Sequence, residues 1–241
     1  MEIVELHFES IDSTNAYAKR ELHSFAKNKL ICITADEQSA GRGRYQRKWI
    51  SPKGVNLYVT FCFALTQPIP DLSCLAEIMA YSFSHLLLED GLHPKIKWPN
   101  DVQLNGKKVS GILSEIVFEG SLVFVILGIG INVNMEKTDL DQIDQPATSL
   151  KAEMGHAMDR QMLLKRLQKQ FEADLDRFKK NGFTPFHSEI EHLLAYKGEP
   201  IRCFDGVKEW QGICHSLTAD GRLNLLLPNG QIHTLLSGDI I

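Results

Sequence analysis

Residues 95–133 read KIKWPNDVQLNGKKVSGILSEIVFEGSLVFVILGIGINV, and this stretch decides the fold. It is rich in β-branched and aliphatic residues, and Asn105-Gly106 and Glu119-Gly120 interrupt it as turn pairs. The pattern predicts strands in hairpin succession at Lys95–Trp98, Val102–Leu104, Lys107–Phe118 and Leu122–Val133. Strands joined by such short turns pair antiparallel, so we expect this stretch to form a sheet.

The chain before this stretch alternates strands with helices. Apolar spacing and cap residues predict the strand Ile3–Phe8 and then a helix from about Thr14 to Ala26, capped by Asp12 or Ser13. The strand Leu30–Thr34 follows and leads into a polar loop, Asp36–Gly54. The strand Asn56–Leu65, ended by Pro68 and Pro70, precedes a core-facing helix over Asp71–Glu89. After the stretch, a helix capped by Asp159 runs to Lys180, and Gly182 ends it.

The pattern changes after Tyr196. Short strand-like segments at Ile201–Phe204, Gln211–Ser216, Leu223–Leu227 and Ile232–Leu235 are separated by Asp205-Gly206, Asp220-Gly221 and Asn229-Gly230. They predict a small all-β unit, which we expect to be a barrel. The fold class is therefore α+β, with one domain over 1–195 and a second over 196–241.

Composition excludes several classes of protein. With 44% hydrophobic and 23% charged residues the chain has ordinary globular composition, and its net charge of -4 gives no reason to expect nucleic acid or membrane as a partner. The longest apolar run, Leu122–Ile131, is far below the ~20 residues of a membrane span. The five cysteines form no C-x-x-C pair and the nine histidines have no metal-ligand spacing, so we expect buried thiols, no structural zinc and a cytoplasmic protein.

The polar loop contains the segment Gln38-Ser39-Ala40-Gly41-Arg42-Gly43-Arg44, followed by Arg47 and Lys48. The two glycines let the backbone approach a ligand closely, and guanidinium groups suit phosphate or carboxylate. A solvated flexible loop and a nucleic-acid contact are the alternatives that this segment leaves open.

The hairpin after Lys97-Trp98-Pro99-Asn100-Asp101 places a lysine beside an aspartate. Pairing around Asn105-Gly106 puts Leu104 opposite Lys107 and Gln103 opposite Lys108. Alternation along the strands then predicts that Asp101, Gln103, Lys108 and Ser110 share one face, with Val102, Leu104 and Val109 on the other. The register favours Lys108 over Lys107 as a site residue. The alternative to a functional site is that the lysine and the aspartate form a surface ion pair.

The third segment is Gly128-Ile129-Gly130-Ile131-Asn132-Val133-Asn134. Period-two alternation places both glycines and both asparagines on one face, as a flat shelf that a planar ligand could approach. A bulge or a close helix crossing would also explain the glycines. The segment lacks the third glycine and the helix start of a dinucleotide-binding fingerprint.

Together these segments resemble the successive motifs of the biotin–protein ligases. The matches occur in the family's order: Ser13-Thr14-Asn15, Gln38 with Gly41-Arg42-Gly43-Arg44, Lys48-Trp49, Gly54 with Asn56-Leu57, Lys97-Trp98-Pro99-Asn100-Asp101, Lys108 with Gly111-Ile112-Leu113, Gly128-Ile129-Gly130-Ile131-Asn132, and more weakly Ala147-Thr148-Ser149-Leu150. The resemblance implies a central mixed sheet flanked by helices, like the catalytic core of class II aminoacyl-tRNA synthetases, and an SH3-like C-terminal domain.

The resemblance also assigns roles to residues. It implies that biotin is bound by Ser13, Thr14, Asn15, Gln38, Arg42, Gly43, Arg44, Lys108 and Gly111. It implies that ATP and the adenylate are bound by Arg44, Trp49, Asn100, Asn132, Gly128 and Gly130. The expected catalytic residues are Lys108, Arg42 and Asp101, with no metal ligand assigned.

The implied activity is ATP- and Mg²⁺-dependent formation of biotinyl-5′-AMP from biotin, followed by transfer to a lysine of a biotin carboxyl carrier protein or domain. We expect Asp101 to orient the lysine amine or accept its proton; binding magnesium or Lys108 is its alternative role. Lipoate–protein ligase and a non-enzymatic, nucleic-acid-binding relative of the synthetases are the alternative functions.

The larger regulatory members of the family carry an N-terminal helix-turn-helix domain. Because the first strand of this chain begins at Ile3, we expect neither that domain nor an operator DNA. The sequence leaves open whether the protein forms a homodimer.

Overall fold

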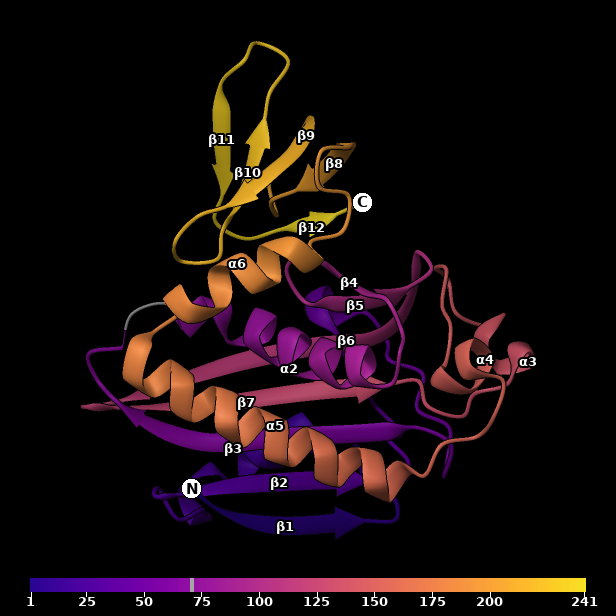
Figure 1. The fold of residues 1–241 in the computed structure, drawn as a ribbon. Coiled ribbons are helices and arrows are strands. Elements are labelled where there is room, and N and C mark those ends of the chain that lie inside the picture. Colours follow the sequence, from indigo (N-terminus) through magenta and orange to yellow (C-terminus); the bar gives the residue numbers. More distant parts are fainter. Residues whose placement is uncertain (70–71) are drawn as a thin grey trace.

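The computed structural model describes residues 1–69 and 72–241, and its largest element is a seven-stranded mixed sheet (Figure 1). The sheet has the order β1-β2-β3-β7-β6-β5-β4. Only β1 and β2 pair parallel among these strands as described. The strands are β1 (Glu2–Phe8), β2 (Lys29–Ala35), β3 (Leu57–Thr66), β4 (Pro94–Lys97), β5 (Asp101–Leu104), β6 (Lys107–Glu119) and β7 (Leu122–Ile131). The predicted mixed sheet is confirmed.

The β5–β6 hairpin has the predicted register at its turn. Leu104 lies opposite Lys107 and Gln103 opposite Lys108, around Asn105 and Gly106 with φ of 50° and 73°. The register then shifts between Val102 and Gln103, so that core Val102 pairs with Ser110 and both are fully buried. The prediction that Ser110 shares the face of Lys108 is therefore wrong, because this irregularity resets the alternation.

Helices cover both faces of the sheet. On one face α2 (Leu75–Glu89), α5 (Arg160–Asn181) and α6 (Thr184–Leu193) pack over the larger core (Figure 1). On the other face α1 (Thr14–Arg20) covers a smaller core that contains Ala18, Ile33 and Ile126. The sheet is thus covered by helices on both of its faces.

The helix limits agree with the sequence in part. Ser13 caps α1 and Asp159 caps α5, while Gly182 ends α5, as predicted. The predicted helix to Ala26 is too long, because the helix ends at Arg20 and Phe25 is extended, with its ring centroid 6.5 Å from that of Tyr17. Two 3₁₀ turns, Leu22–Ser24 and Leu72–Cys74, flank the regular helices. The predicted break at Pro70 and helix start at Asp71 lie outside the described residues.

Three short helices were not predicted: α3 (Lys137–Leu140), α4 (Leu150–Met154) and α6. The first two are too short for the apolar period of a helix to repeat. In the described part of the chain no helix combines the length and apolar character needed to cross a membrane.

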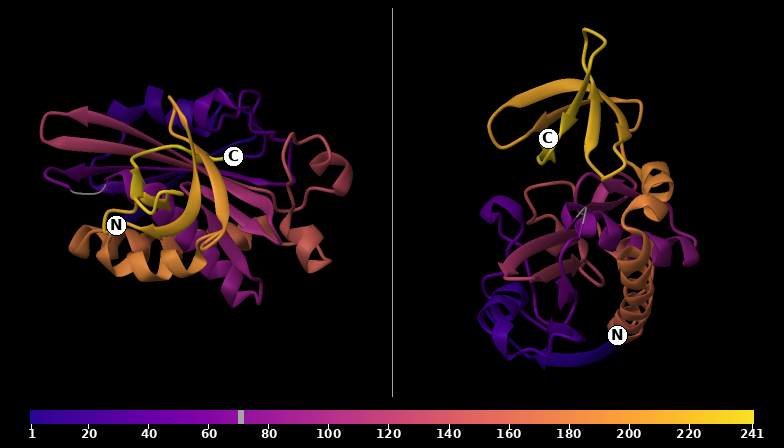
Figure 2. Two further views of the ribbon diagram at one scale, coloured as in Figure 1. Left: turned by 90° about the horizontal axis from the view of Figure 1, so that it is seen from above. Right: turned by 90° about the vertical axis from the view of Figure 1, so that its left-hand side faces the viewer.

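The second sheet has five strands in the order β11-β10-β9-β8-β12. They are β8 (Pro200–Phe204), β9 (Glu209–Leu217), β10 (Leu223–Leu226), β11 (Ile232–Leu235) and the unpredicted β12 (Asp239–Ile240). Among the described residues β11 and β12 do not pair, so the sheet is open where a closed barrel was expected. Figures 1 and 2 show it beyond the β4 edge of the main sheet, next to α6.

All five cysteine side chains are buried, as predicted. Burial raises the pKa of the Cys32, Cys62 and Cys203 thiols to about 12. These thiols are protonated at neutral pH, and they serve as small apolar core groups.

Candidate active site

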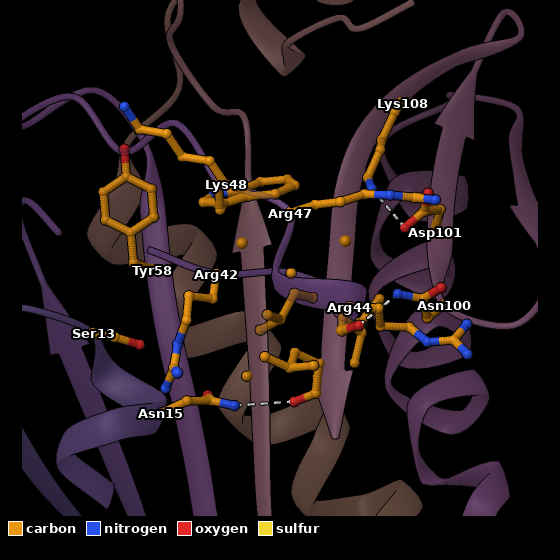
Figure 3. A pocket seen from close by; sticks show the side chains of 18 of the residues that line it. Ser13, Asn15, Arg42, Arg44, Arg47, Lys48, Tyr58, Asn100, Asp101 and Lys108 are labelled. Atoms are coloured by element: carbon orange, nitrogen blue, oxygen red, sulfur yellow. Dashed lines mark hydrogen bonds and ion pairs between the residues drawn. The ribbon is translucent and has the colours of Figure 1, made fainter. Parts of the chain in front are cut away.

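A pocket of about 890 Å³, including its open mouth, lies where β3, β7, β6 and the loop 38–49 meet (Figure 3). Of the residues that we predicted for the site, those lining it are Ser13, Thr14, Asn15, Gln38, Arg42, Gly43, Arg44, Trp49, Asn100, Asp101, Lys108, Gly111, Gly128 and Gly130. The structure thus brings together four segments that are far apart in the sequence.

One end of the pocket is a hydrogen-bonded cluster at the start of α1. Gln38 Oε1 accepts from the Thr14 backbone N–H at 2.9 Å. Thr60, which is fully buried on β3, donates to Asn15 Oδ1 at 2.6 Å and contacts Thr14 Oγ1 at 2.8 Å. These bonds fix neutral donors and acceptors in place, which suits a polar, uncharged ring. Thr60 was missed because it lies in an otherwise apolar strand.

The glycine shelf on β7 accommodates side chains of the protein itself. A Cβ on Gly128 would lie 2.2 Å from Asn15 Oδ1, and a Cβ on Gly130 would lie 2.4 Å from the Trp49 ring. Glycine is therefore required at both positions for close approach. Gly111 on β6 also faces the Trp49 ring, at 3.1 Å from its Cβ position. The shelf places Asn15 and Trp49 against the floor of the pocket.

The loop 41–49 forms one wall. Gly41 is required because a Cβ there would lie 2.8 Å from Trp49 O, whereas a Cβ on Gly43 would meet its nearest atom at 3.7 Å. Tyr45 and Gln46 have φ of 53° and 60°, a region that side chains other than glycine rarely adopt. Figure 3 shows Arg42 directed toward the Ser13 and Asn15 end of the pocket.

Lys108 and Asp101 form an ion pair inside the pocket (Figure 3). The distance from Lys108 Nζ to Asp101 Oδ1 is 2.8 Å, and their side chains are only 16% and 14% exposed. Lys108 Nζ also lies 5.5 Å from the centre of the Trp49 ring. The pair is shielded from solvent, so the alternative of an exposed surface ion pair is wrong, and Lys108 presents a positive charge at a fixed position.

Positive charge dominates the pocket. Six cationic side chains line it (Arg42, Arg44, Arg47, Lys48, Lys97 and Lys108), against the two carboxylates of Asp101 and Asp239. The whole chain carries a net charge of -4, so cations are concentrated at this site. Such a concentration attracts a polyanion and offsets charge that develops during phosphoryl chemistry.

We predicted Asn132 as an adenylate-binding residue, but it does not line this pocket. It is 2% exposed, and its Nδ2 donates to Thr148 O at 3.1 Å. It lines an adjoining cavity with Trp49, Gln142, Ile143, Asp144, Gln145 and Ala147. Arg47, Lys48, Trp49, Lys108 and Gln145 line both cavities. The reason is that the strand ends at Ile131, so the period-two pattern does not extend to Asn132.

Asp239 and Ile240 were not predicted to belong to the site, although both line the pocket. They come from β12, at the far end of the chain, and β12 has only two residues. No local sequence pattern indicates such a contact, because it depends on how the second sheet packs against the first.

The mixed sheet and its cation-rich pocket suit an enzyme that handles an anionic, phosphate-bearing substrate. Comparison with known proteins makes this specific. The model of the biotin/lipoate A/B protein ligase family matches residues 7–132. The chain belongs to this family.

The chain is also similar to individual proteins that are named as biotin ligases. The biotin–[acetyl-CoA-carboxylase] ligase of Paracoccus denitrificans is 35% identical over 232 residues, which is 91% of this chain and 93% of the relative. The bifunctional ligase/repressor BirA of Escherichia coli is 33% identical over 232 residues, 95% of this chain and 71% of the relative. The Aquifex aeolicus biotin protein ligase, solved in complex with biotin and ATP, matches with a TM-score of 0.83 and 31% identity over 100% of this chain and 97% of that one.

Proposed function

We propose that this chain is a biotin–protein ligase that activates biotin with ATP and transfers the biotinyl group to a lysine of a biotin carboxyl carrier protein or domain. The observation that carries the proposal is the shielded Lys108–Asp101 pair in a cation-rich pocket whose other end is the neutral Thr14–Gln38 cluster. The neutral end suits the ring of biotin, and the cationic end suits its carboxylate together with the phosphates of ATP.

In the first step an oxygen of the biotin carboxylate attacks the α-phosphorus of ATP and pyrophosphate leaves, giving biotinyl-5′-AMP. Negative charge crowds at the reacting phosphate. Lys108 and Arg42 are the residues we assign to offset it, because Lys108 is held by Asp101 and Arg42 adds a second cation to the lining of the same pocket. We assign Arg44, Asn100 and Trp49 to binding of the adenylate, and the cavity beside Asn132 to binding of its adenine ring.

In the second step the amine of the carrier lysine attacks the acyl carbon, and AMP leaves. A lysine amine with a pKa near ~10.4 must lose a proton before it attacks. Asp101 is the only carboxylate other than Asp239 among the described pocket residues, and its side chain is 14% exposed. We assign Asp101 to orient the amine or accept its proton.

Magnesium would enter as the complex with ATP. Mg²⁺ is usually held by one or two carboxylates together with phosphates and water. The pocket offers Asp101 and Asp239, both already ion-paired, and within the described residues no three His, Cys, Asp or Glu side chains gather as a metal site. These donors fit an ion held mainly by the nucleotide and water, which would supply further charge neutralisation.

The proposal extends to the whole protein. We assign residues 1–195 to the catalytic domain and 196–241 to a C-terminal domain related to the SH3-like barrel, which the succession of strands β8 to β11 supports. Burial of the five cysteine side chains supports a cytoplasmic location. Gathering of the cations inside one pocket of an acidic chain supports a carrier protein, rather than nucleic acid, as the macromolecular partner. Homodimer formation stays a prediction.

The test combines the protein with ATP, Mg²⁺, biotin and a biotinyl carrier domain, and reads the carrier by intact mass. We expect one biotinyl group per carrier, and none on a carrier whose acceptor lysine is replaced by arginine. A parallel reaction with lipoate tests the alternative ligase, and lipoyl transfer without biotinyl transfer would refute the proposal.

A further inference from the structure

The end of the chain returns to the pocket and contacts its arginines. Asp239 Oδ1 lies 2.7 Å from Arg44 Nη1, and Asp239 Oδ2 lies 3.0 Å from Arg47 Nη1. Arg44 Nη1 also donates to Gly238 O at 2.8 Å. The Asp239 side chain is 11% exposed, so one shielded carboxylate of the second sheet links two cations of the loop 41–49.

This contact leaves both arginines able to bind a second anion. Each guanidinium meets Asp239 through Nη1, and a guanidinium carries five N–H donors. The Nη2 contact of Arg44 in the described structure is a long one, 3.4 Å from the Tyr45 hydroxyl. Donors on the sides that face away from Asp239 therefore remain for phosphate oxygens.

Asp239 is itself held rigidly. It pairs with Phe204 on β8, and the neighbouring Gly238 has a φ of 149° and lies so close to Phe204 O that a Cβ there would come within 2.5 Å. A carboxylate on such a backbone has little freedom to follow a moving partner. It acts instead as a fixed point for the arginines.

The loop needs such a fixed point. Two consecutive non-glycine residues, Tyr45 and Gln46, have positive φ, a conformation that costs energy and persists only when surrounding contacts hold it. Arg44 and Arg47 flank these residues and would repel one another without an anion between them. Their guanidinium carbons lie 5.2 Å and 5.8 Å from the Tyr45 ring centre. Contact with Asp239 thus offsets both the strain and the repulsion.

We propose that Asp239 is a positioning residue of the active site, which aligns Arg44 and Arg47 from the C-terminal sheet so that their outer donors meet the phosphates of ATP and of the adenylate. This inference rests on the proposed function, because it names ATP as the second anion. It makes the C-terminal sheet a part of the nucleotide site. A carboxylate that merely competed with the phosphates would have the opposite effect on ATP binding.

The first experiment tests the contact without any substrate. Trypsin cleaves after arginine, and cleavage at Arg44 and Arg47 requires the loop to open. We expect Asp239→Asn to speed cleavage at these two positions several-fold, as followed by mass spectrometry. Glu209→Gln is the matched control, since it removes one exposed carboxylate from the same sheet, paired with Arg202 at 3.9 Å. Equal cleavage of the two variants would overturn the proposal.

The second experiment separates positioning from competition. In biotin-dependent pyrophosphate release, we expect Asp239→Asn to raise the KM for ATP roughly tenfold or more, the effect of one charge-assisted contact. Biotin affinity, measured by calorimetry without ATP, should fall by much less than ATP affinity, and Asp239→Glu should restore part of the ATP KM. A lower ATP KM, or equal losses of biotin and ATP affinity, would overturn the positioning role.

The two proposals fail in different ways. A wild-type protein that releases no pyrophosphate with biotin and ATP would refute the proposed function, and the trypsin experiment would still decide whether Asp239 holds the loop. An active wild type, with an Asp239→Asn variant that matches it in both experiments, would refute the role of Asp239 alone.

Discussion

At the residue scale, Lys108 and Asp101 show how far local pattern determines a site. Asn105-Gly106 can form only a tight turn, and both residues have the positive φ that such a turn requires. The turn fixes which lysine lies beside Asp101, and the structure places Lys108 Nζ 2.8 Å from it. Lys107, one position earlier, is exposed.

This geometry predicts unequal effects for the two lysines. Lys108→Ala should lower the rate of biotin-dependent pyrophosphate release by roughly a hundredfold or more, because it removes a fixed charge at the reacting phosphate. Lys107→Ala is the matched control and should cost little. Both variants should keep the far-ultraviolet circular dichroism of the wild type. Equal activity of the two variants would show that Lys108 has no catalytic role.

A second prediction concerns retention of the intermediate. Arg44→Gly removes a cation from the wall of the pocket and a contact to Asp239, so it should loosen the loop that closes over the adenylate. Losing one charge-assisted contact costs ~1.5–3 kcal/mol, or roughly ten- to a hundredfold in retention. Adenylate formation should be affected less, because Arg42 and Lys108 remain.

The measurement supplies ATP and biotin together with a bystander protein that is not a carrier. Biotin on the lysines of the bystander should rise with Arg44→Gly relative to wild type. If the variant forms the adenylate but labels the bystander no faster, then Arg44 does not retain the intermediate.

Residues that reach the site from distant parts of the chain could not be predicted. Thr60 contacts Thr14 and Asn15 across 45 or more positions, and Asp239 contacts Arg44 across 195. Neither belongs to a local pattern of charge or turn residues. By contrast Gly128 and Gly130 were predicted as a shelf because glycine inside a strand is unusual, but the sequence could not show that Asn15 and Trp49 occupy it.

At the scale of elements, the strands of the two sheets were predicted well because turn residues mark their ends. Elements that lack such marks were missed: α3 and α4 are four and five residues long, and β12 is two. The irregularity between Val102 and Gln103 was also missed, since it arises where the hairpin must meet the neighbouring strand β7. Tertiary packing, rather than propensity, determines these features.

Helix α2 carries a testable electrostatic feature, the carboxyl group of Glu77. Burial at the interface with Trp98 raises its pKa well above the ordinary value, against smaller lowering effects from Trp98 and Arg44. The folded protein therefore keeps a proton that the unfolded chain loses above about pH 4.3. Stability should therefore fall as pH rises from there toward the folded-state pKa.

Glu77→Gln tests this sign. The variant cannot lose a proton, so its Tm should match that of the wild type near pH 4 and exceed it increasingly as the pH rises toward the folded-state pKa of Glu77. Thermal unfolding over this pH range gives the difference, and Glu9→Gln, which changes an exposed carboxyl, should show no such trend. A difference between Glu77→Gln and wild type that is independent of pH would contradict the assignment.

At the scale of the whole molecule, the two sheets meet around the motif Lys97-Trp98-Pro99-Asn100-Asp101. Trp98 Nε1 donates to Gly221 O at 3.0 Å, and His187 on α6 contacts Leu217 O at 3.0 Å. Together with Asp239 and Arg44, these contacts join the C-terminal sheet to the pocket. The sequence indicates two units but not their relative position, since the contacts involve single atoms on distant turns.

Ligand binding should therefore stabilise the molecule as a whole. A ligand that binds only the folded state adds RT ln(1 + [L]/Kd), about 2.7 kcal/mol at a hundred times its Kd. For a chain of this size ~1 kcal/mol corresponds to roughly 2–4 °C in Tm, so a tightly bound adenylate should raise Tm by about 5–10 °C. Biotin with ATP and Mg²⁺ should give this shift, because biotinyl-AMP contacts the Thr14 end, the arginine loop and the adjoining cavity together.

Biotin alone or ATP alone should give a smaller rise in Tm, and lipoate with ATP should give no larger rise than ATP alone. Chelating Mg²⁺ should remove the part of the Tm shift that exceeds those of the separate ligands. An equal shift with lipoate would contradict the proposed preference for biotin, and additive shifts from biotin and ATP would show that no common intermediate forms.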